Sequence, residues 1–352
     1  MRTSCSMTSV VRYAGLLLLS VVLVLLTACE RTPEPVRFNG STMGTTYHVT
    51  VPALPEGLDI ETIQSRFDEL LQNVNGEMST YQPDSVISEF NRSESTDWFP
   101  VSPAFARVTQ TALELSRLSD GAYDVTVAPL IELWGFGAKF PDSEAIPDDA
   151  SIQQALARTG FEKVELQTQP FAIRKHSAKV TMDLSSIAKG YGVDVLAAYL
   201  ESVGITDFLV EIGGELRAAG KSERGDAWRI AVEKPVAGER SVQRVIELRD
   251  VGIATSGDYR NYFEKDGKRY SHMIDAATGR PVTHRLASVT VLADTAMLAD
   301  GWATTLMLLG EEKGYALAER RGLAAYFIYR QADAFEVRET EAFTRITGEH
   351  AS

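Results

Sequence analysis

The strongest constraint on the fold lies at the N-terminus, where residues 14–26 are almost wholly apolar and follow Arg2 and Arg12. A helix that spans a membrane needs about 20 apolar residues, so a shorter run behind a positive start is typical of a signal peptide. The run ends in Leu26-Thr27-Ala28-Cys29, which resembles the lipobox read by lipoprotein signal peptidase. The sequence therefore predicts a signal peptide over 1–28 and lipid, such as palmitate, on Cys29. The alternative is an ordinary signal peptide with a chance cysteine.

The cysteine content agrees with export from the cytoplasm. The chain has two cysteines, Cys5 and Cys29. Cys5 would leave with the signal peptide and Cys29 would carry lipid. The mature domain would then have no thiol, which excludes a disulfide framework, a cysteine nucleophile and a thiolate metal site.

The charge of the chain limits its partners. Cleavage would leave about 324 of the 352 residues, enough for a substantial core, and would move the formal charge from −13 to −15 by removing Arg2 and Arg12. Nucleic acid requires a basic face, and a polybasic hold on anionic lipid requires clustered lysine and arginine. We therefore expect no nucleic-acid partner, and membrane attachment through the lipid anchor alone.

The hydrophobic pattern predicts one domain with mixed secondary structure. Residues 29–38 are rich in proline and charge and are expected to form a lipidated tether, with the domain at 39–345. Helices are predicted over 59–74, 103–119, 151–159, 187–203, 294–309 and 311–321. Strands are predicted over 46–51, 171–175, 179–184, 208–212, 228–233, 243–249, 286–293, 324–330 and 335–340, with a hairpin turn at Asp266-Gly267. Long helices mixed with hairpins indicate an α+β fold with largely antiparallel sheet.

Several familiar catalytic patterns do not occur in the sequence. The five histidines form neither H-x-H nor H-E-x-x-H, so a zinc site of familiar spacing is not expected. The chain has no G-x-S-x-G and no Walker loop. Gly213-Gly214 and Gly190-Tyr191-Gly192 lack the spacing of a dinucleotide-binding fingerprint. The fold is therefore not expected to be of the Rossmann kind.

Asp300 and Thr304 form the first informative cluster. In a helix they would share one face, because they are four residues apart. A carboxylate and a hydroxyl are hard oxygen ligands that suit Mg²⁺. Such a pair is more often a solvated helix edge, but the neighbouring residues are apolar, and a buried carboxylate needs a partner. Of the two interpretations, a solvated helix edge and a magnesium site, the magnesium site is the more specific.

A second cluster lies at 181–194, where a strand ending at Asp183 is expected to lead into a helix through Ser185 and Ser186. Backbone N–H groups at a helix start, with Lys189 nearby, favour an anionic phosphate. The alternative is a plain N-cap with an exposed lysine.

The remaining candidates are weaker when taken singly. Met43 in 40–46 and Tyr81 in 78–81 could pack against a flat ring, and Gly121-Ala122-Tyr123-Asp124 pairs small residues with an acid. Each is more typical of core or turn. His272, flanked by Ser271 and Asp275, is the best general-base candidate in the chain, although a lone histidine is usually structural.

These segments, in this order, resemble the ApbE family of FAD:protein FMN transferases. The resemblance runs from Gly40 to about Leu309. It rests on GSTMGTTY, EMSTYQPDSVISEFN, GAYDVTVAPL, MDLSSIAKGYGVD, TSGDYRNY, the YSHMID…TGRP segment and the Ala-Asp-x-x-x-Thr helix. It implies a T-fold-like fold, a FAD pocket and a Mg²⁺ site. The implied FAD-binding residues are Met43, Tyr81, Ala122, Tyr123, Asp124, Asp183, Lys189 and Ile274. The implied Mg²⁺ ligands are Asp300, Thr304 and a backbone carbonyl near Ser186.

The resemblance also implies a reaction and a location. A threonine hydroxyl of a target protein would attack the FMN-side phosphorus of FAD and release AMP, with Mg²⁺ neutralising developing charge. His272 is our hypothesis for the base. Targets would be subunits of membrane redox pumps of the Nqr and Rnf type, on the periplasmic side of the inner membrane. Two alternatives stay open: a Mg²⁺-dependent FAD pyrophosphatase that yields FMN and AMP, and a flavin-binding lipoprotein without catalysis.

Overall fold

The computed structural model describes residues 34–137, 146–236, 238, 241–259, 261–332 and 334–348. The predicted signal peptide and Cys29 lie outside these residues. Within them, no helix combines the length and the apolar character needed to cross a membrane.

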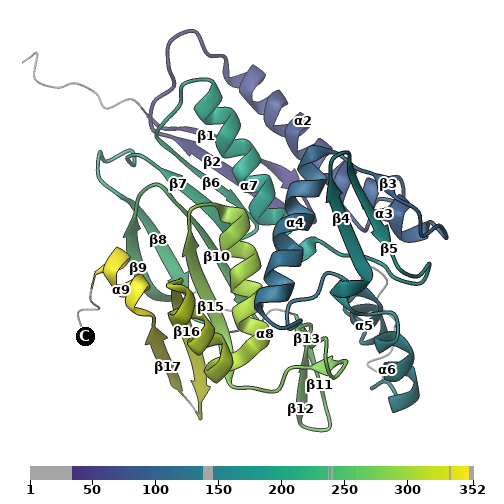
Figure 1. Cartoon of the computed structure of the whole chain (residues 1–352). Coiled ribbons are helices and arrows are strands. Elements are labelled where there is room, and N and C mark those ends of the chain that lie inside the picture. Colours follow the sequence, from purple (N-terminus) through teal and green to yellow (C-terminus); the bar gives the residue numbers. More distant parts are fainter. Residues whose placement is uncertain are drawn as a thin grey trace, which may run out of the picture. The chain divides into compact units, whose positions relative to one another are not determined.

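An eight-stranded antiparallel sheet forms the centre of the domain (Figure 1). Its strand order is β1-β2-β6-β7-β10-β15-β16-β17, and every neighbouring pair is antiparallel. The strands are β1 (Val36–Thr42), β2 (Thr45–Val51), β6 (Phe208–Ile212), β7 (Glu215–Ala219), β10 (Val251–Gly257), β15 (Leu286–Ala293), β16 (Ala324–Gln331) and β17 (Ala334–Glu339). The α+β class with largely antiparallel sheet is confirmed.

Helices cover one face of this sheet (Figure 1). α7 (Ser185–Ser202) and α8 (Ala296–Arg321) lie directly against it, and α2 (Ile60–Met78) and α4 (Pro103–Leu118) pack beside them. Local sequence starts two of these helices, because Asp59 accepts a hydrogen bond from the backbone of Thr62, and Ser102 accepts one from Phe105. The shorter helices are α3 (Val86–Arg92), α5 (Ala128–Leu133), α6 (Asp149–Leu156) and α9 (Glu341–Thr347).

A two-stranded hairpin, β8 (Trp228–Glu233) with β9 (Val242–Leu248), packs on the opposite face. Its inward side chains Trp228, Ile230 and Ile246 form one core cluster with residues of β10 and β16. Three smaller sheets complete the described part: β3 (Phe99–Pro100) with β5 (Phe171–Lys175) and β4 (Val164–Thr168), β11 (Tyr262–Lys265) with β12 (Lys268–Ser271), and β13 (Ile274–Asp275) with β14 (Arg280–Pro281). The main sheet is therefore enclosed between helices and a hairpin.

The main sheet has an opening beside the end of β10. β10 pairs with β15 from Gly252 to Gly257, which lies opposite Ser288. It pairs with β7 only from Val251 to Ile253. Among the described residues the last part of β10 therefore has no strand on its β7 side, and a cavity there is lined by residues from both faces of the sheet.

One local prediction was wrong, and the structure adds a strand ahead of the predicted start of the domain. β1 begins at Val36, and its Phe38 is buried in the core. Residues 179–184 form no strand, because the side chain of Asn91 bonds both backbone groups of Met182, at 2.7 and 2.8 Å. Side-chain bonds here replace those of a sheet ladder.

Candidate active site

A cavity of about 640 Å³ occupies the opening beside β10. It contacts the helix face of the sheet through Ser256, whose side chain meets α8, and the hairpin face through Ile253. Nine of the predicted site residues line it: Ala122, Tyr123, Asp124, Ser186, Lys189, His272, Ile274, Asp300 and Thr304. These nine come from segments that are far apart in the sequence, and the fold brings them to one place.

Asp300 and Thr304 lie on α8 and border the cavity together. Asp300 is 3% exposed. One of its carboxylate oxygens accepts a hydrogen bond from the backbone N–H of Gly190, at 3.0 Å. The hydroxyl of Thr304 lies 3.1 Å from that of Ser256 on β10. The helix thus presents a carboxylate and a hydroxyl on one face, as the spacing of the two residues predicted.

Lys189 lies between two buried carboxylates. Its Nζ is 2.6 Å from Oε2 of Glu215 and 3.9 Å from Oδ1 of Asp300. Burial lowers the pKa of Lys189, but attraction by Asp300 and Glu215 outweighs that effect and raises it overall. Burial raises the pKa of Asp300 and of Glu215, and Lys189 opposes both shifts. The lysine therefore stays cationic and is held at the cavity wall.

The residue types around Asp300 fit a magnesium ion. The wall offers a carboxylate and two hydroxyls, and Mg²⁺ prefers one or two carboxylates completed by water and phosphate oxygens. If both are ionised, Asp300 and Glu215 bring two negative charges against the single positive charge of Lys189, and buried charge needs compensation. Among the described residues no group of three or more His, Cys, Asp or Glu side chains could hold a metal by itself. Phosphate and water would have to supply the remaining ligands.

Tyr123 and Ser186 join two walls of the cavity. The hydroxyl of Ser186 donates to that of Tyr123 at 2.8 Å, and burial raises the pKa of this tyrosine. The carboxylate of Asp124 binds backbone groups of the protein itself. It accepts hydrogen bonds from the backbone N–H of Thr126 at 2.7 Å and from that of Phe161 at 2.9 Å. The carboxylate of Asp124 therefore shapes the wall.

His272 lies at the cavity with one ring nitrogen engaged. Its Nδ1 is 3.0 Å from the carbonyl oxygen of Asn261. A carbonyl only accepts, so Nδ1 carries the proton, and Nε2 of the neutral ring has a free lone pair. Burial is the main cause that lowers the pKa of His272 below its ordinary value of 6.5. The ring is consequently in the form that a general base requires at neutral pH.

Three predicted FAD-binding residues do not line the cavity. Met43 packs against two core clusters. Tyr81 is 70% exposed. Asp183 accepts a hydrogen bond from the backbone of Ser185, at 2.7 Å, and so stabilises the start of α7. Their predicted contacts with FAD remain predictions.

Glu215 is a site residue that was not predicted from the sequence. This residue is 4% exposed, lines the cavity and forms the shorter of the two ion pairs of Lys189. It follows the Gly213-Gly214 turn at the first position of β7. The available signal was an acidic residue directly after a glycine pair. Its partner, Lys189, lies 26 positions earlier in the chain, so no local pattern links the two.

Comparison with known proteins identifies the family. A model of the ApbE family matches residues 43–327. The FAD:protein FMN transferase of Vibrio cholerae is 47% identical over 322 residues, covering 91% of this chain and 95% of that protein. That of Haemophilus influenzae is 44% identical over 330 residues, covering 92% and 94%. The structure of the flavin transferase ApbE from Vibrio cholerae superimposes with a TM-score of 0.83 at 45% identity, covering 89% of this chain and 99% of the other. The chain therefore belongs to the ApbE family, the family of the FAD:protein FMN transferases.

Proposed function

We propose that this flavin transferase moves the FMN part of FAD to a threonine hydroxyl of a second protein, in a Mg²⁺-dependent reaction that releases AMP. One observation carries the proposal: a single cavity holds the oxygen ligands of α8, the cation of Lys189 and the free nitrogen of His272. These are the groups needed to hold a diphosphate and to take a proton from an alcohol.

Each group has a defined role in this reaction. Asp300, Thr304 and the backbone carbonyl of Ser186 would hold Mg²⁺. When bound, this ion supplies positive charge that stabilises the developing charge on the attacked phosphate. Lys189 binds a phosphate oxygen. Nε2 of His272 takes the threonine proton as the new O–P bond forms and the bond to the AMP phosphate breaks. AMP leaves with the electrons of that bond.

The acceptor and its location belong to the same proposal. A lipid on Cys29 would confine the enzyme to the periplasmic side of the inner membrane, where subunits of Nqr- and Rnf-type redox pumps would be the targets. Confinement to one membrane raises the effective concentration of a membrane-bound partner. The lipobox and the family membership support this part.

Mass spectrometry of a co-incubated subunit tests the proposal. The full chain is mixed with FAD, Mg²⁺ and an Nqr- or Rnf-type subunit, beside samples that contain a chelator or a threonine-to-alanine acceptor. We expect an FMN phosphoester on threonine that needs both Mg²⁺ and the hydroxyl. Free FMN and AMP alone would identify a pyrophosphatase, and intact FAD would identify a binding protein.

A further inference from the structure

The free edge of β8 borders the cavity. The five consecutive residues Arg229 to Glu233 all line it. Successive side chains of a strand point to opposite faces, and Ile230 and Val232 are buried in the core beneath the hairpin. A cavity that contacts every residue of such a strand runs along its edge, where the backbone is presented.

Over Trp228–Val232 that edge has no strand partner among the described residues. β8 and β9 form a two-stranded sheet of their own, and β9 takes the other edge of β8. An unpaired edge presents N–H and C=O groups that can pair with another chain. Peptides are often bound by adding a strand to an exposed edge of this kind.

The cavity opens to solvent beside this edge. The lining residues Gly214, Ala231 and Thr255 are exposed and come from the β6–β7 turn, from β8 and from the end of β10. Leu209 and Leu216 of the main sheet line the same space and offer apolar surface. A segment lying along β8 would therefore place its side chains alternately over the apolar surface and away from it.

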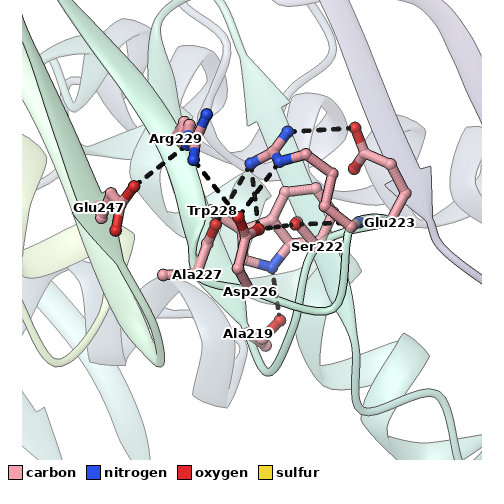
Figure 2. A network of polar contacts seen from close by, with 9 residues as sticks. Ala219, Ser222, Glu223, Asp226, Ala227, Trp228, Arg229 and Glu247 are labelled. Carbon is pink, nitrogen blue, oxygen red and sulfur yellow. Dashed lines mark hydrogen bonds and ion pairs between the residues drawn. The ribbon is translucent and has the colours of Figure 1, made fainter.

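A polar network holds the start of β8 in place (Figure 2). The indole N–H of Trp228 donates to the carbonyl of Ala219 at 2.8 Å, which ties β8 to the end of β7. Asp226 binds Arg224 at 3.2 Å, and Arg229 binds Glu247 of β9 at 3.1 Å. An edge that is fixed before binding lowers the entropy cost of adding a strand.

We infer that the acceptor segment of the target protein binds as an added β-strand along the free edge of β8, with its threonine directed into the cavity. This inference rests on the proposed function. Its physical basis is continuity: the edge that can recognise an extended chain is itself a wall of the cavity in which the hydroxyl must react. Backbone pairing would position the threonine while tolerating different neighbouring side chains.

Amide hydrogen exchange tests the inference on the full chain. Exchange is followed residue by residue in the enzyme alone, with FAD, and with FAD plus a target subunit whose acceptor threonine is replaced by alanine. The amount of this variant is set from its inhibition of transfer to the unaltered subunit. We expect alternate amides within 229–232 to exchange at least about 10-fold more slowly only when the subunit is present. The outward amides of β9 should not change, and they serve as the matched control.

Three results would overturn the inference. The first is protection of β8 by FAD alone, and the second is an inhibited enzyme with unchanged exchange in β8. The third is no inhibition by the alanine variant, because docking does not use the hydroxyl. Covalent flavin on the unaltered subunit, measured in parallel, reports on the proposed function separately. Transfer without protection would contradict only the docking of the acceptor along β8, whereas absence of transfer would contradict the proposed reaction.

Discussion

Asp300 is deeply buried, and its two carboxylate oxygens have different neighbours. One of its oxygens is fixed by Gly190, and the other lies 3.9 Å from Lys189. The sequence predicted this residue and Thr304, because helical spacing in an apolar segment is local information. It did not predict Glu215, because that pairing depends on a contact between β7 and α7 that no local pattern records.

Replacing Asp300 with Asn should remove the charge and keep the shape. We expect Mg²⁺-dependent turnover to fall at least about 100-fold, because substitutions around metal sites typically cost 10–100-fold even outside the direct ligands. A Mg²⁺ titration of transfer rate measures the change. Asp294→Asn, an exposed carboxylate two positions before the same helix, should behave as the wild type. An unaltered Mg²⁺ profile in Asp300→Asn would refute the metal assignment.

His272→Ala should lower the transfer rate by about 10²–10⁴-fold, the usual contribution of a general base. The pKa of His272 also sets the direction in which the transfer rate changes with pH. The pKa of His272 lies below its ordinary value, so the ring stays neutral at pH 7 and becomes protonated only in acid. Wild-type activity should therefore be level at neutral pH and fall as pH drops below the usual histidine range. The exposed His48→Ala is the control, and wild-type rates in His272→Ala would exclude the role.

Glu215→Gln should weaken FAD binding through Lys189. Loss of one partner of a buried ion pair costs about 3–5 kcal/mol, and the lower end applies because the side chain of Lys189 keeps 30% exposure. Denaturant unfolding measures the stability, and the KM for FAD measures the positioning of the lysine. We expect KM to rise more than kcat falls. An unaffected KM together with lower stability would assign Glu215 to structure alone.

Among the elements, the contact between α7 and α8 explains how the site is held. A Cβ at Gly190 would lie 2.3 Å from the backbone oxygen of Ala296, so the two helices approach as closely as glycine permits. The same glycine donates to Asp300. Helix spacing and ligand geometry are therefore set by one residue.

Gly190→Ala should destabilise the domain by about 1–3 kcal/mol through overpacking, although alanine favours helix by itself. It should also weaken Mg²⁺ dependence by moving Asp300. Gly192→Ala is the matched control on the same helix, because its Cβ would meet the flexible end of Met43 at 2.9 Å. Thermal unfolding and Mg²⁺ titration of both variants decide the point, and equal behaviour of the two would contradict the explanation.

Most long elements could be predicted from the sequence. The expected break between helices 294–309 and 311–321 is confirmed at Gly310, whose φ of 75° is non-helical. Of the strands in the main sheet, β1, β7 and β10 were missed. β10 carries Gly252, Ser256 and Gly257, which are poor strand formers, and it is stabilised by its neighbours β7 and β15. Tertiary pairing outweighed local propensity there.

At the scale of the whole molecule, the sequence indicated the class of the fold but not its strand order. β6 and β7 follow β2 in the sheet although α2 to α7 intervene in the chain. The opening beside β10 follows from unequal strand lengths in that order. Hydrophobic periodicity does not contain this information, so the cavity could be predicted only through the resemblance.

Membrane attachment is a prediction about the whole chain. Cys29→Ser should abolish incorporation of radiolabelled palmitate and leave the signal peptide uncleaved, because the lipid is attached to this cysteine and the lipoprotein signal peptidase reads the lipobox. Labelling of cells, followed by immunoprecipitation and electrophoresis, measures both the label and the size of the chain. Cys5→Ser is the matched control and should keep the label and the mature size, since Cys5 would be removed with the signal peptide. Retained label in Cys29→Ser would contradict the lipobox.

The opening in the main sheet has a consequence for local unfolding. A dinucleotide lying there would contact the helical layer and the hairpin layer together, so neither layer could move outward without losing contacts to it. Occupancy by the flavin should therefore suppress transient opening of both layers to the same degree. Limited proteolysis in the 220–227 loop and in the segment preceding α7 should slow in parallel as the nucleotide concentration rises.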